Sequence, residues 1–232
     1  MLYTEEALRA NVRNREGKRV FYLGKGDQLT SAARDWAARE RIEILPAELA
    51  APKSFRLLQG GSLREKPEHM THLQGDVLVN KTHPRIRFRG KLDTLEAELL
   101  LAAQAAPAFR NELAEILNLA RQLIRCDVLE EPLNGASLCG LTPEEIRRRS
   151  HFPQDHYGQP HFMPAFSDGP ALLQLNRARC AAREAEIYAV DAFSDREGNP
   201  TRPDILQAMN RISSMLYLLM IRCKTDLSHN KG

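Results

Sequence analysis

Apolar residues recur with helical spacing through most of the chain after residue 90. One set begins with Leu92, Leu95 and Leu99, and a second set keeps the i, i+3, i+4, i+7 spacing from Leu113 to Ile124. Thr142-Pro-Glu-Glu145 has the sequence of a capping box with proline at the first helical position, which predicts a short third helix. Two further helices are predicted, one from Pro170 to about Phe193 and one from about residue 203 to Lys224. The pattern is typical of a mainly α protein built as a helical bundle.

The first fifty residues have a different pattern. A short helix is predicted for 5–15, strands for 19–23 and 41–45, and a helix capped by Thr30 for 30–39. Residues 1–50 therefore predict a small α/β appendage. Residues 51–70 contain Pro52, Gly60, Gly61 and Pro67 and show little periodicity, which predicts a linker or loop. The helical bundle is then expected to occupy residues 71–232.

Composition narrows the class of protein. Aromatic residues make up 6% of the chain and hydrophobic residues 43%, which favours a helical core over a sandwich or barrel. No apolar run approaches the roughly 18 residues of a membrane span, and the start lacks the pattern of a signal peptide. The net charge of +3 is too small to indicate nucleic acid binding. We therefore expect a cytoplasmic protein with no membrane or nucleic acid partner.

The four cysteines are Cys126, Cys139, Cys180 and Cys223. They are widely separated and form no Cys-x-x-Cys pair, so the sequence predicts free thiols and neither a disulfide framework nor a cysteine-bound zinc site. Most of the 33 basic residues are arginine. Since the guanidinium fork suits carboxylates and phosphates, this bias mildly favours an anionic ligand, although genomic composition produces the same bias.

Two helices predicted to be neighbours carry polar residues at matching spacing. Arg179, Arg183 and Glu186 follow i, i+4, i+7 on one, and Asn210, Ser214 and Tyr217 do the same on the other. If the helices are antiparallel, the arginines face the amide across a pocket suited to a polyphosphate. The alternative for the first set alone is a solvated charged face.

A second group of cations precedes the first long helix. Lys81-Thr-His-Pro-Arg85 is followed by Arg87-Phe-Arg-Gly-Lys-Leu-Asp93, and cations close to a helix N-terminus hold phosphates together with the free amides. Asp93 has two open interpretations, a residue of the site or an acid that favours the helix dipole.

These pieces together resemble a known family. The order Lys81-x-x-Pro-Arg-x-x-x-x-Gly90-x-x-Asp93, Arg179-x-x-x-Arg183-x-x-Glu186 and Asn210-Arg-Ile-Ser213 is similar to the cobalamin adenosyltransferases of the propanediol-utilisation type. Thr71-His-Leu73, Asp127-x-Leu-x-Glu-Pro-Leu133, Ser150-His-x-Pro153 and the run 202–214 resemble the ethanolamine-utilisation branch. The resemblance covers most of the chain from residue 66 onward and includes the opening residues 4–11.

The resemblance implies transfer of the 5′-deoxyadenosyl group of ATP to cob(I)alamin, with release of triphosphate. It implies that Arg183 and Asn210 contact ATP, that Lys81 and Arg85 hold its phosphates, and that Arg179 pairs with Asp93 while Glu186 orients the arginines. It also implies a homo-oligomer, dimer or trimer, with the site near a subunit interface. ATP, Mg²⁺ and cobalamin are the expected ligands, and ethanolamine ammonia-lyase and a bacterial microcompartment are the expected setting.

The family places an apolar residue under the cobalt, where it displaces the lower axial ligand. The matching segment is His161-Phe-Met-Pro164, in which His161 stands at the position of the usual phenylalanine. We favour Phe162 for this role because histidine is itself a cobalt ligand. The alternative, in which Phe162 anchors the loop, has equal weight.

The sequence departs from the family in two further places. Where relatives carry a glycine-rich nucleotide loop, this chain has Glu65-Lys-Pro-Glu-His-Met-Thr-His-Leu73, so Thr71 and His72 become the candidate nucleotide contacts, and Gly24-Lys-Gly-Asp27 is interpreted as a turn. Many ethanolamine-type members have a cysteine cluster in the region of 50–66, and this chain has none there. We therefore expect no cysteine-bound transition metal. The departures keep open an alternative, a corrinoid- or nucleotide-binding module without turnover.

Overall fold

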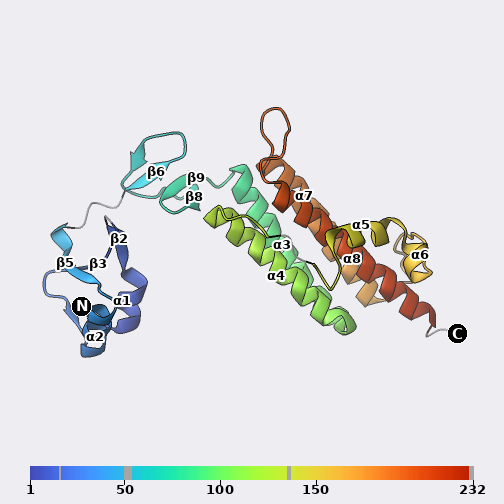
Figure 1. Ribbon diagram of the computed structural model, residues 1–232, viewed down its shortest axis with the longest axis horizontal. Coiled ribbons are helices and arrows are strands. Elements are labelled where there is room, and N and C mark those ends of the chain that lie inside the picture. Colours follow the sequence, from blue (N-terminus) through green and yellow to red (C-terminus); the bar gives the residue numbers. More distant parts are fainter. Residues whose placement is uncertain (16, 50–53, 135–136, 230–232) are drawn as a thin grey trace. The chain divides into compact units, whose positions relative to one another are not determined.

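The chain folds into two compact units, Met1–Ser54 and Phe55–Gly232 (Figure 1). The computed structural model describes residues 1–15, 17–49, 54–134 and 137–229, with the backbone alone for 227–229. The division between the units follows Ser54, inside the segment 51–70. In the part of the chain that is described, no helix combines the length and the apolar character needed to span a membrane.

The first unit is a small α/β structure. Thr4 and Thr30 each accept a hydrogen bond from the backbone N–H three residues on, which caps its two helices. Leu8, Phe21 and Trp36 pack together in its core. The predicted turn at Gly24 is present, since the Asp27 N–H donates to the Gly24 carbonyl. Its elements are β1 (Leu2–Tyr3), α1 (Glu5–Asn11), β2 (Arg13–Arg15), β3 (Lys18–Leu23), β4 (Gln28–Leu29), α2 (Ser31–Arg39), β5 (Glu43–Pro46) and the 3₁₀ turn η1 (Ala47–Leu49).

The second unit begins with a four-stranded sheet. Its strands are β6 (Phe55–Leu57), β7 (Ser62–Leu63), β8 (Met70–Gln74) and β9 (Val77–Asn80), in the order β7-β6-β9-β8. Strand β6 pairs parallel to β9 and antiparallel to β7. Both β6 and β7 lie within 51–70, the segment expected to be a linker, so two short stretches of it are paired into a sheet. Short strands without a long alternating pattern explain why the sequence did not indicate them.

Long helices make up the rest of the unit, as predicted. They are α3 (Pro84–Ala105), α4 (Arg110–Leu129), α5 (Pro143–His151), α6 (Pro153–Tyr157), α7 (Pro170–Ala192) and α8 (Pro203–His229), with the 3₁₀ turn η2 (Pro107–Phe109) before α4. The capping box of Thr142 and Glu145 is formed in full. Helix α3 begins at Pro84, earlier than the apolar pattern indicated. Asp93 therefore lies inside α3, and its interpretation as an N-terminal acid is wrong.

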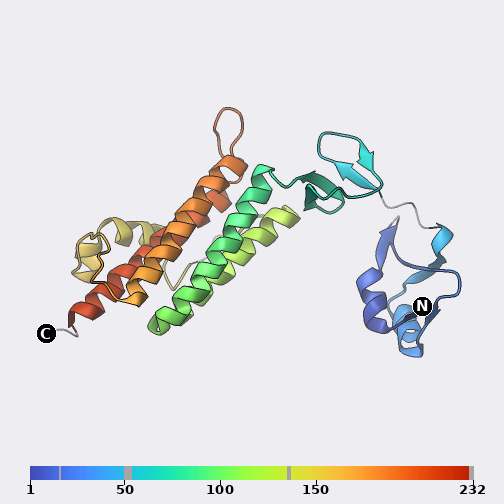
Figure 2. The ribbon, with the colours of Figure 1, turned by 180° about the vertical axis from the view of Figure 1, so that it is seen from behind.

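Helix α7 packs against both α3 and α8, which lie beside it in both views (Figures 1 and 2). The face that it buries carries Ala178, Ala182, Ala185 and Ala189, each 0% exposed. Methyl side chains at this spacing let helix axes approach closely. Leu92, Leu95 and Leu99 of α3 and Ile205, Met209 and Ile212 of α8 belong to the same core.

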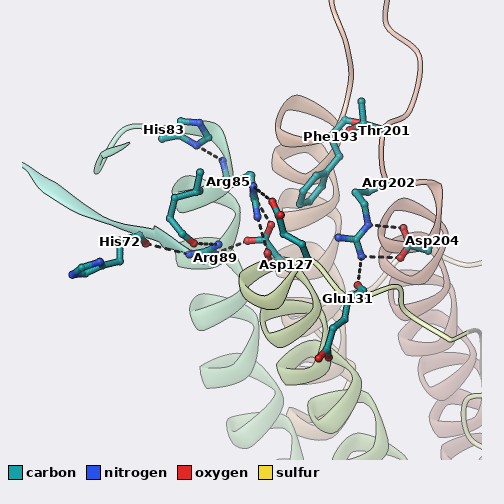
Figure 3. A network of polar contacts seen from close by, with 12 residues as sticks. His72, His83, Arg85, Arg89, Asp127, Glu131, Phe193, Thr201, Arg202 and Asp204 are labelled. Atoms are coloured by element: carbon teal, nitrogen blue, oxygen red, sulfur yellow. Dashed lines mark hydrogen bonds and ion pairs between the residues drawn. The ribbon is translucent and has the colours of Figure 1, made fainter. Parts of the chain in front are cut away.

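A buried carboxylate joins the sheet to the bundle (Figure 3). Asp127 of α4 is 0% exposed and accepts hydrogen bonds from Arg85 Nε, at 2.6 Å, and from Arg89 Nε. Arg89 also donates to the Leu73 carbonyl in β8, at 2.8 Å. One carboxylate therefore connects the start of α3, the end of α4 and the edge of the sheet.

We expect Asp127→Ala to lower the free energy of unfolding by about 3–5 kcal/mol, because two partly buried guanidinium groups lose the buried carboxylate that they share and Arg85 keeps just a 3.4 Å ion pair with the exposed Glu130. Asp127→Asn, which keeps the shape without the charge, should give an intermediate loss. The control is Arg125→Ala on the same helix, whose ion pair with Glu131 is largely exposed; it should change stability by less than about 0.5 kcal/mol. Urea unfolding followed by far-UV circular dichroism measures all three, and equal effects of D127A and R125A would contradict the assignment.

Candidate functional site

A pocket of ≈ 490 Å³ lies between α7 and α8. Its lining contains Arg179, Arg183 and Glu186 from α7 and Asn210 from α8, the residues whose matching spacing predicted a polyphosphate pocket. Asn210 Nδ2 donates to Glu186 Oε1 at 2.9 Å, so the two stripes do face each other. The pocket is open to solvent on one side, where Ile187 is 69% and Val190 48% exposed.

The two arginines differ in how they are held. Arg179 donates to Asn176 Oδ1 from Nε and Nη2, at 3.4 and 3.3 Å, and its guanidinium lies 5.8 Å from the ring centre of Tyr217. Arg183 is exposed, and none of the described residues forms a hydrogen bond or ion pair with its guanidinium. Glu186 is engaged by Asn210. Arg183 is thus a cation available to an anionic ligand, and Arg179 is a second one that an amide and an aromatic ring position.

Tyr217 connects this pocket to the loop before α7. Its hydroxyl lies 2.8 Å from His161 Nδ1, and its ring stacks on that of His161, with 5.8 Å between ring centres. The Phe162 ring is stacked against the same tyrosine at 6.4 Å. Burial raises the pKa of Tyr217, which keeps the phenol neutral and able to donate a hydrogen bond. One aromatic side chain therefore contacts Arg179 on one side and the loop 161–162 on another.

His161 and Phe162, the two candidates for contact with cobalt, are both anchored. The second ring nitrogen of His161, Nε2, lies 3.1 Å from the His151 carbonyl oxygen, so both nitrogens have protein partners. Phe162 is half-buried against the bundle core, with Lys224 Nζ 5.5 Å from its ring centre. Beyond them the loop exposes Met163 at 86% and Phe166 fully, two apolar side chains that the sequence did not single out.

The predicted phosphate contacts near the sheet lie apart from this pocket. Thr71 and His72 belong to β8, where His72 Nδ1 lies 3.0 Å from the Gly75 carbonyl oxygen and its ring packs edge-on against Phe55. Lys81 follows β9 and is exposed. None of the three is among the described residues that line the pocket between α7 and α8.

Arg85 and Asp93 also lie outside this pocket. Arg85 gives Nε and Nη2 to the side chain and carbonyl of Asp127, both at 2.6 Å, and so serves the network of Figure 3. Asp93 is exposed on α3 and has no hydrogen bond or ion pair with any described residue. The predicted pairing of Arg179 with Asp93 is not formed within this chain, where Arg179 contacts Asn176 instead.

Several pocket residues were missed. Ser150 and Ser213 contribute hydroxyl groups to the lining, and Ile187 and Val190 contribute apolar edges. Ile187 is four residues from Arg183 on the same helix, so the spacing that selected the arginines could also have selected it. Ser150 comes from α5, which the sequence alone does not place beside α7.

The described residues contain no group of three or more His, Cys, Asp or Glu side chains that could hold a metal ion. All four cysteines are free thiols; Cys126 and Cys223 are buried, and Cys180 is exposed. Glu186 is the carboxylate that the described pocket lining offers.

Comparison with known proteins assigns the sequence to a family. The cobalamin adenosyltransferase family profile matches residues 62–223. The corrinoid adenosyltransferase EutT of Salmonella typhimurium is 32% identical over 94% of this chain and 90% of its own length, and that of Escherichia coli is 31% identical over the same shares. A solved variant of the PduO-type ATP:co(I)rrinoid adenosyltransferase from Lactobacillus reuteri, complexed with ATP, covers 67% of this chain and 89% of its own, at 20% identity and a TM-score of 0.49. The match over residues 62–223 and the similarity to the EutT proteins along nearly the whole chain show that this protein belongs to the cobalamin adenosyltransferase family.

Proposed function

We propose that the protein transfers the 5′-deoxyadenosyl group of ATP to cob(I)alamin, giving adenosylcobalamin and triphosphate. The observation that carries the proposal is the pocket between α7 and α8, in which Arg183 has no hydrogen bond or ion pair with any described residue and Asn176 positions Arg179 beside it. Membership of the family and the names of the two EutT relatives support the same reaction.

The residue types suit this chemistry. The reduced cobalt of the substrate is itself a strong nucleophile, so the protein need not supply one. The cobalt electron pair forms a bond to C5′, the C5′–O bond breaks, and its electron pair leaves with the triphosphate. Arg183 and Arg179 stabilise the charge that builds on the leaving group, and Asn210, held by Glu186, orients the nucleotide.

Mg²⁺ belongs to the proposal as a companion of ATP. This ion usually keeps several waters and takes most of its other ligands from substrate phosphates, with one or two carboxylates from the protein. Glu186 fits the part of such a carboxylate, since Asn210 engages Oε1 and leaves Oε2 available to the pocket. Lys81, Thr71 and His72 remain proposed contacts of the nucleotide.

For the corrinoid, we assign Phe162 as the residue beneath the cobalt. Both nitrogens of His161 are engaged by Tyr217 and by the His151 carbonyl group, which makes histidine the brace of the loop. The apolar ring of Phe162 lacks a lone pair, so it can fill the lower position without coordinating the metal. To do so it must leave its contact with Tyr217, and the loop that carries it connects α6 to α7.

We further propose that the site is completed by a second copy of the chain. Asp93 is exposed and unpaired among the described residues, and the edge of the pocket beside Arg183 exposes Ile187. On α3, Leu100 and Leu101 are 52% and 51% exposed, which gives this helix apolar surface as well. A homo-oligomer, dimer or trimer, would cover these residues and bring Asp93 and Lys81 of one copy to the arginines of another. Arg85 stays with Asp127 and is left out of this site.

The resemblance to the ethanolamine-utilisation branch supports a proposal for the setting of the reaction. We propose that the product serves ethanolamine ammonia-lyase, in the cytoplasm and beside or inside a bacterial microcompartment. Neither nucleic acid nor a membrane is a proposed partner.

The first test is turnover with an Arg183 series. Wild-type protein, ATP, Mg²⁺ and strongly reduced cobalamin, mixed anaerobically in the dark, should form a photolabile alkylcobalamin and triphosphate. Arg183→Ala should lower kcat/KM by about 100- to 1,000-fold, the usual effect of removing one donor from a developing anion. Arg183→Lys should recover part of the loss, because it restores the charge but not the planar fork.

The matched control is Arg196→Ala, an exposed arginine in the loop before α8, which should leave kcat/KM unchanged. Wild-type protein that forms neither product would refute the enzyme. Tight binding of ATP and cobalamin, unaffected by R183A and without turnover, would favour the binding module.

The second test asks whether the site is shared between copies. Asp93→Ala and Arg183→Ala, each nearly inactive alone, should recover about a quarter of wild-type activity when co-expressed, since each interface draws Asp93 from one copy and Arg183 from another at random. Co-expression of Arg179→Ala with Arg183→Ala, two residues of one helix, is the control and should recover none. A mixture of D93A and R183A no more active than its parts would assign both residues to one chain.

The third test separates His161 from Phe162. Phe162→Ala should abolish the absorption and electron paramagnetic resonance signals of four-coordinate cob(II)alamin formed in the presence of ATP, because the lower position is no longer filled. His161→Ala should weaken corrinoid binding while the bound fraction keeps the four-coordinate signal. The reverse result, loss of the signal in H161A alone, would move the role to His161.

A further inference from the structure

A second groove, of ≈ 340 Å³, lies on the other side of α5, between that helix and α8. Glu144, Arg147, Arg148 and His151 line it from α5, at the i, i+3, i+4, i+7 spacing of one helical stripe. Arg211 and Gln207 line it from α8. The sequence shows the run 147–149 as a charged helix end, but the fold turns two of its arginines toward a third from another helix.

The charge in this groove is not balanced. Three guanidinium groups line it with one carboxylate, Glu144, and the described residues provide no hydrogen bond or ion pair to the side chains of Arg147 and Arg148. The neighbouring Arg149 differs, since it pairs with Glu145 within α5. Three like charges that share one lining carboxylate raise the free energy of the empty groove, and a bound anion lowers it.

Arg211 is the best fixed of the three. It is half-buried, and its Nε atom is buried without a hydrogen-bond partner. Burial and the charge of Arg147 lower the pKa of Arg211, so its surroundings disfavour the bare cation. A phosphate oxygen in the groove would add negative charge to that of Glu144, and guanidinium groups bind such oxygens with paired hydrogen bonds.

The groove is adjacent to both halves of the proposed active site. Arg211 Nη1 donates to Asn210 Oδ1, and Asn210 in turn donates to Glu186 in the arginine pocket. On the other side, the carbonyl group of His151 contacts His161, in the loop assigned to the lower face of the corrinoid. The residues that would bind an anion here therefore contact residues of both halves of that site.

We propose that the groove formed by Arg147, Arg148 and Arg211 is a subsite for a phosphate-ester group of a substrate, a proposal that rests on the function proposed above. Two substrate groups have this chemistry. Cobalamin carries a phosphodiester in the tail that bears its lower-ligand base, and a base displaced by Phe162 leaves on the face of the corrin that the loop 161–162 contacts. ATP carries the triphosphate. The position next to His161 favours the corrinoid tail.

The experiment is calorimetric titration of the whole protein with three ligands, under anaerobic conditions. The ligands are cob(II)alamin in the presence of ATP, cob(II)inamide with ATP, which has the corrin but no phosphodiester, and tripolyphosphate alone. Arg147→Ala/Arg148→Ala is compared with Arg110→Ala/Arg196→Ala, which removes the same charge from exposed positions outside the groove. Arg211→Gln is a third variant, which keeps a polar side chain at the partly buried position.

If the groove binds the corrinoid tail, the groove variants should raise the Kd of cob(II)alamin about five- to tenfold and leave the Kd of cob(II)inamide unchanged. The difference in Kd between wild type and variant should disappear at high salt. If the groove binds the triphosphate of ATP, the Kd of tripolyphosphate should rise by a similar factor, and the Kd values of both corrinoids should stay the same. Either pattern supports the subsite and identifies which substrate group it binds. Unchanged affinities for cob(II)alamin and tripolyphosphate, or an equal effect of the control pair, would overturn it.

The outcomes also separate this subsite from the reaction. Wild-type protein that makes no adenosylcobalamin, yet binds tripolyphosphate through Arg147 and Arg148, would remove the proposed function and keep an anion site. Wild-type protein that turns over normally, with anion affinities indifferent to R147A/R148A, would remove the subsite alone.

Discussion

Close packing of α7 on its two neighbours is the constraint on which the site depends. Ala178, Ala182, Ala185 and Ala189 present no side chain longer than a methyl group, so α7 can lie deep between α3 and α8. Arg179, Arg183 and Glu186 each follow one of these alanines by one position, which rotates them about 100° around the helix. Burial of the alanines therefore fixes where the charged stripe emerges, at the edge facing Asn210 of α8. A larger residue in the alanine stripe would move the arginines as a group.

The buried Asp127 network imposes a second constraint, at the N-terminal end of α3 (Figure 3). Because Asp127 binds Arg85 and Arg89 together, it holds the sheet edge and the start of α3 on α4. Lys81 and Thr71 are consequently fixed near the end of the bundle, whereas Arg183 lies farther along α7. This network keeps Lys81 apart from Arg183 within one chain. The two groups of cations that the sequence analysis identified, one before α3 and one on α7, therefore lie on different surfaces.

The sequence was sufficient for the parts of the structure that local patterns determine. Apolar periodicity predicted the long helices, the Thr142 capping box was formed as expected, and the residues selected by i, i+4, i+7 spacing, Arg179, Arg183 and Asn210, line one pocket whose ligand stays a prediction. It was insufficient where a partner lies far along the chain. Arg85 looked like a phosphate contact because nothing near it in sequence shows that Asp127, 42 residues later, takes its donors. The start of α3 was missed for the same reason, since its first turns carry charges that a buried carboxylate and a neighbouring helix satisfy.

Tyr217 shows how tertiary packing brings together two groups of residues that are separate in the sequence, the proposed phosphate-binding arginines and the proposed corrinoid-binding loop. Its distance from Arg179 is set by the register of α8 on α7, and its stacking on His161 fixes the loop that precedes α7. Arg179 and Phe162 thus contact the same ring, so neither can shift without disturbing the contacts of the other. In the proposed reaction the leaving phosphates and the cobalt must lie on opposite sides of C5′, and a misplacement of about 1 Å costs roughly 100-fold in rate. Tyr217, neutral and half-buried, holds both Arg179 and His161, the brace of the loop that carries Phe162, so a connection between the two sides persists when Phe162 leaves the ring for the corrinoid.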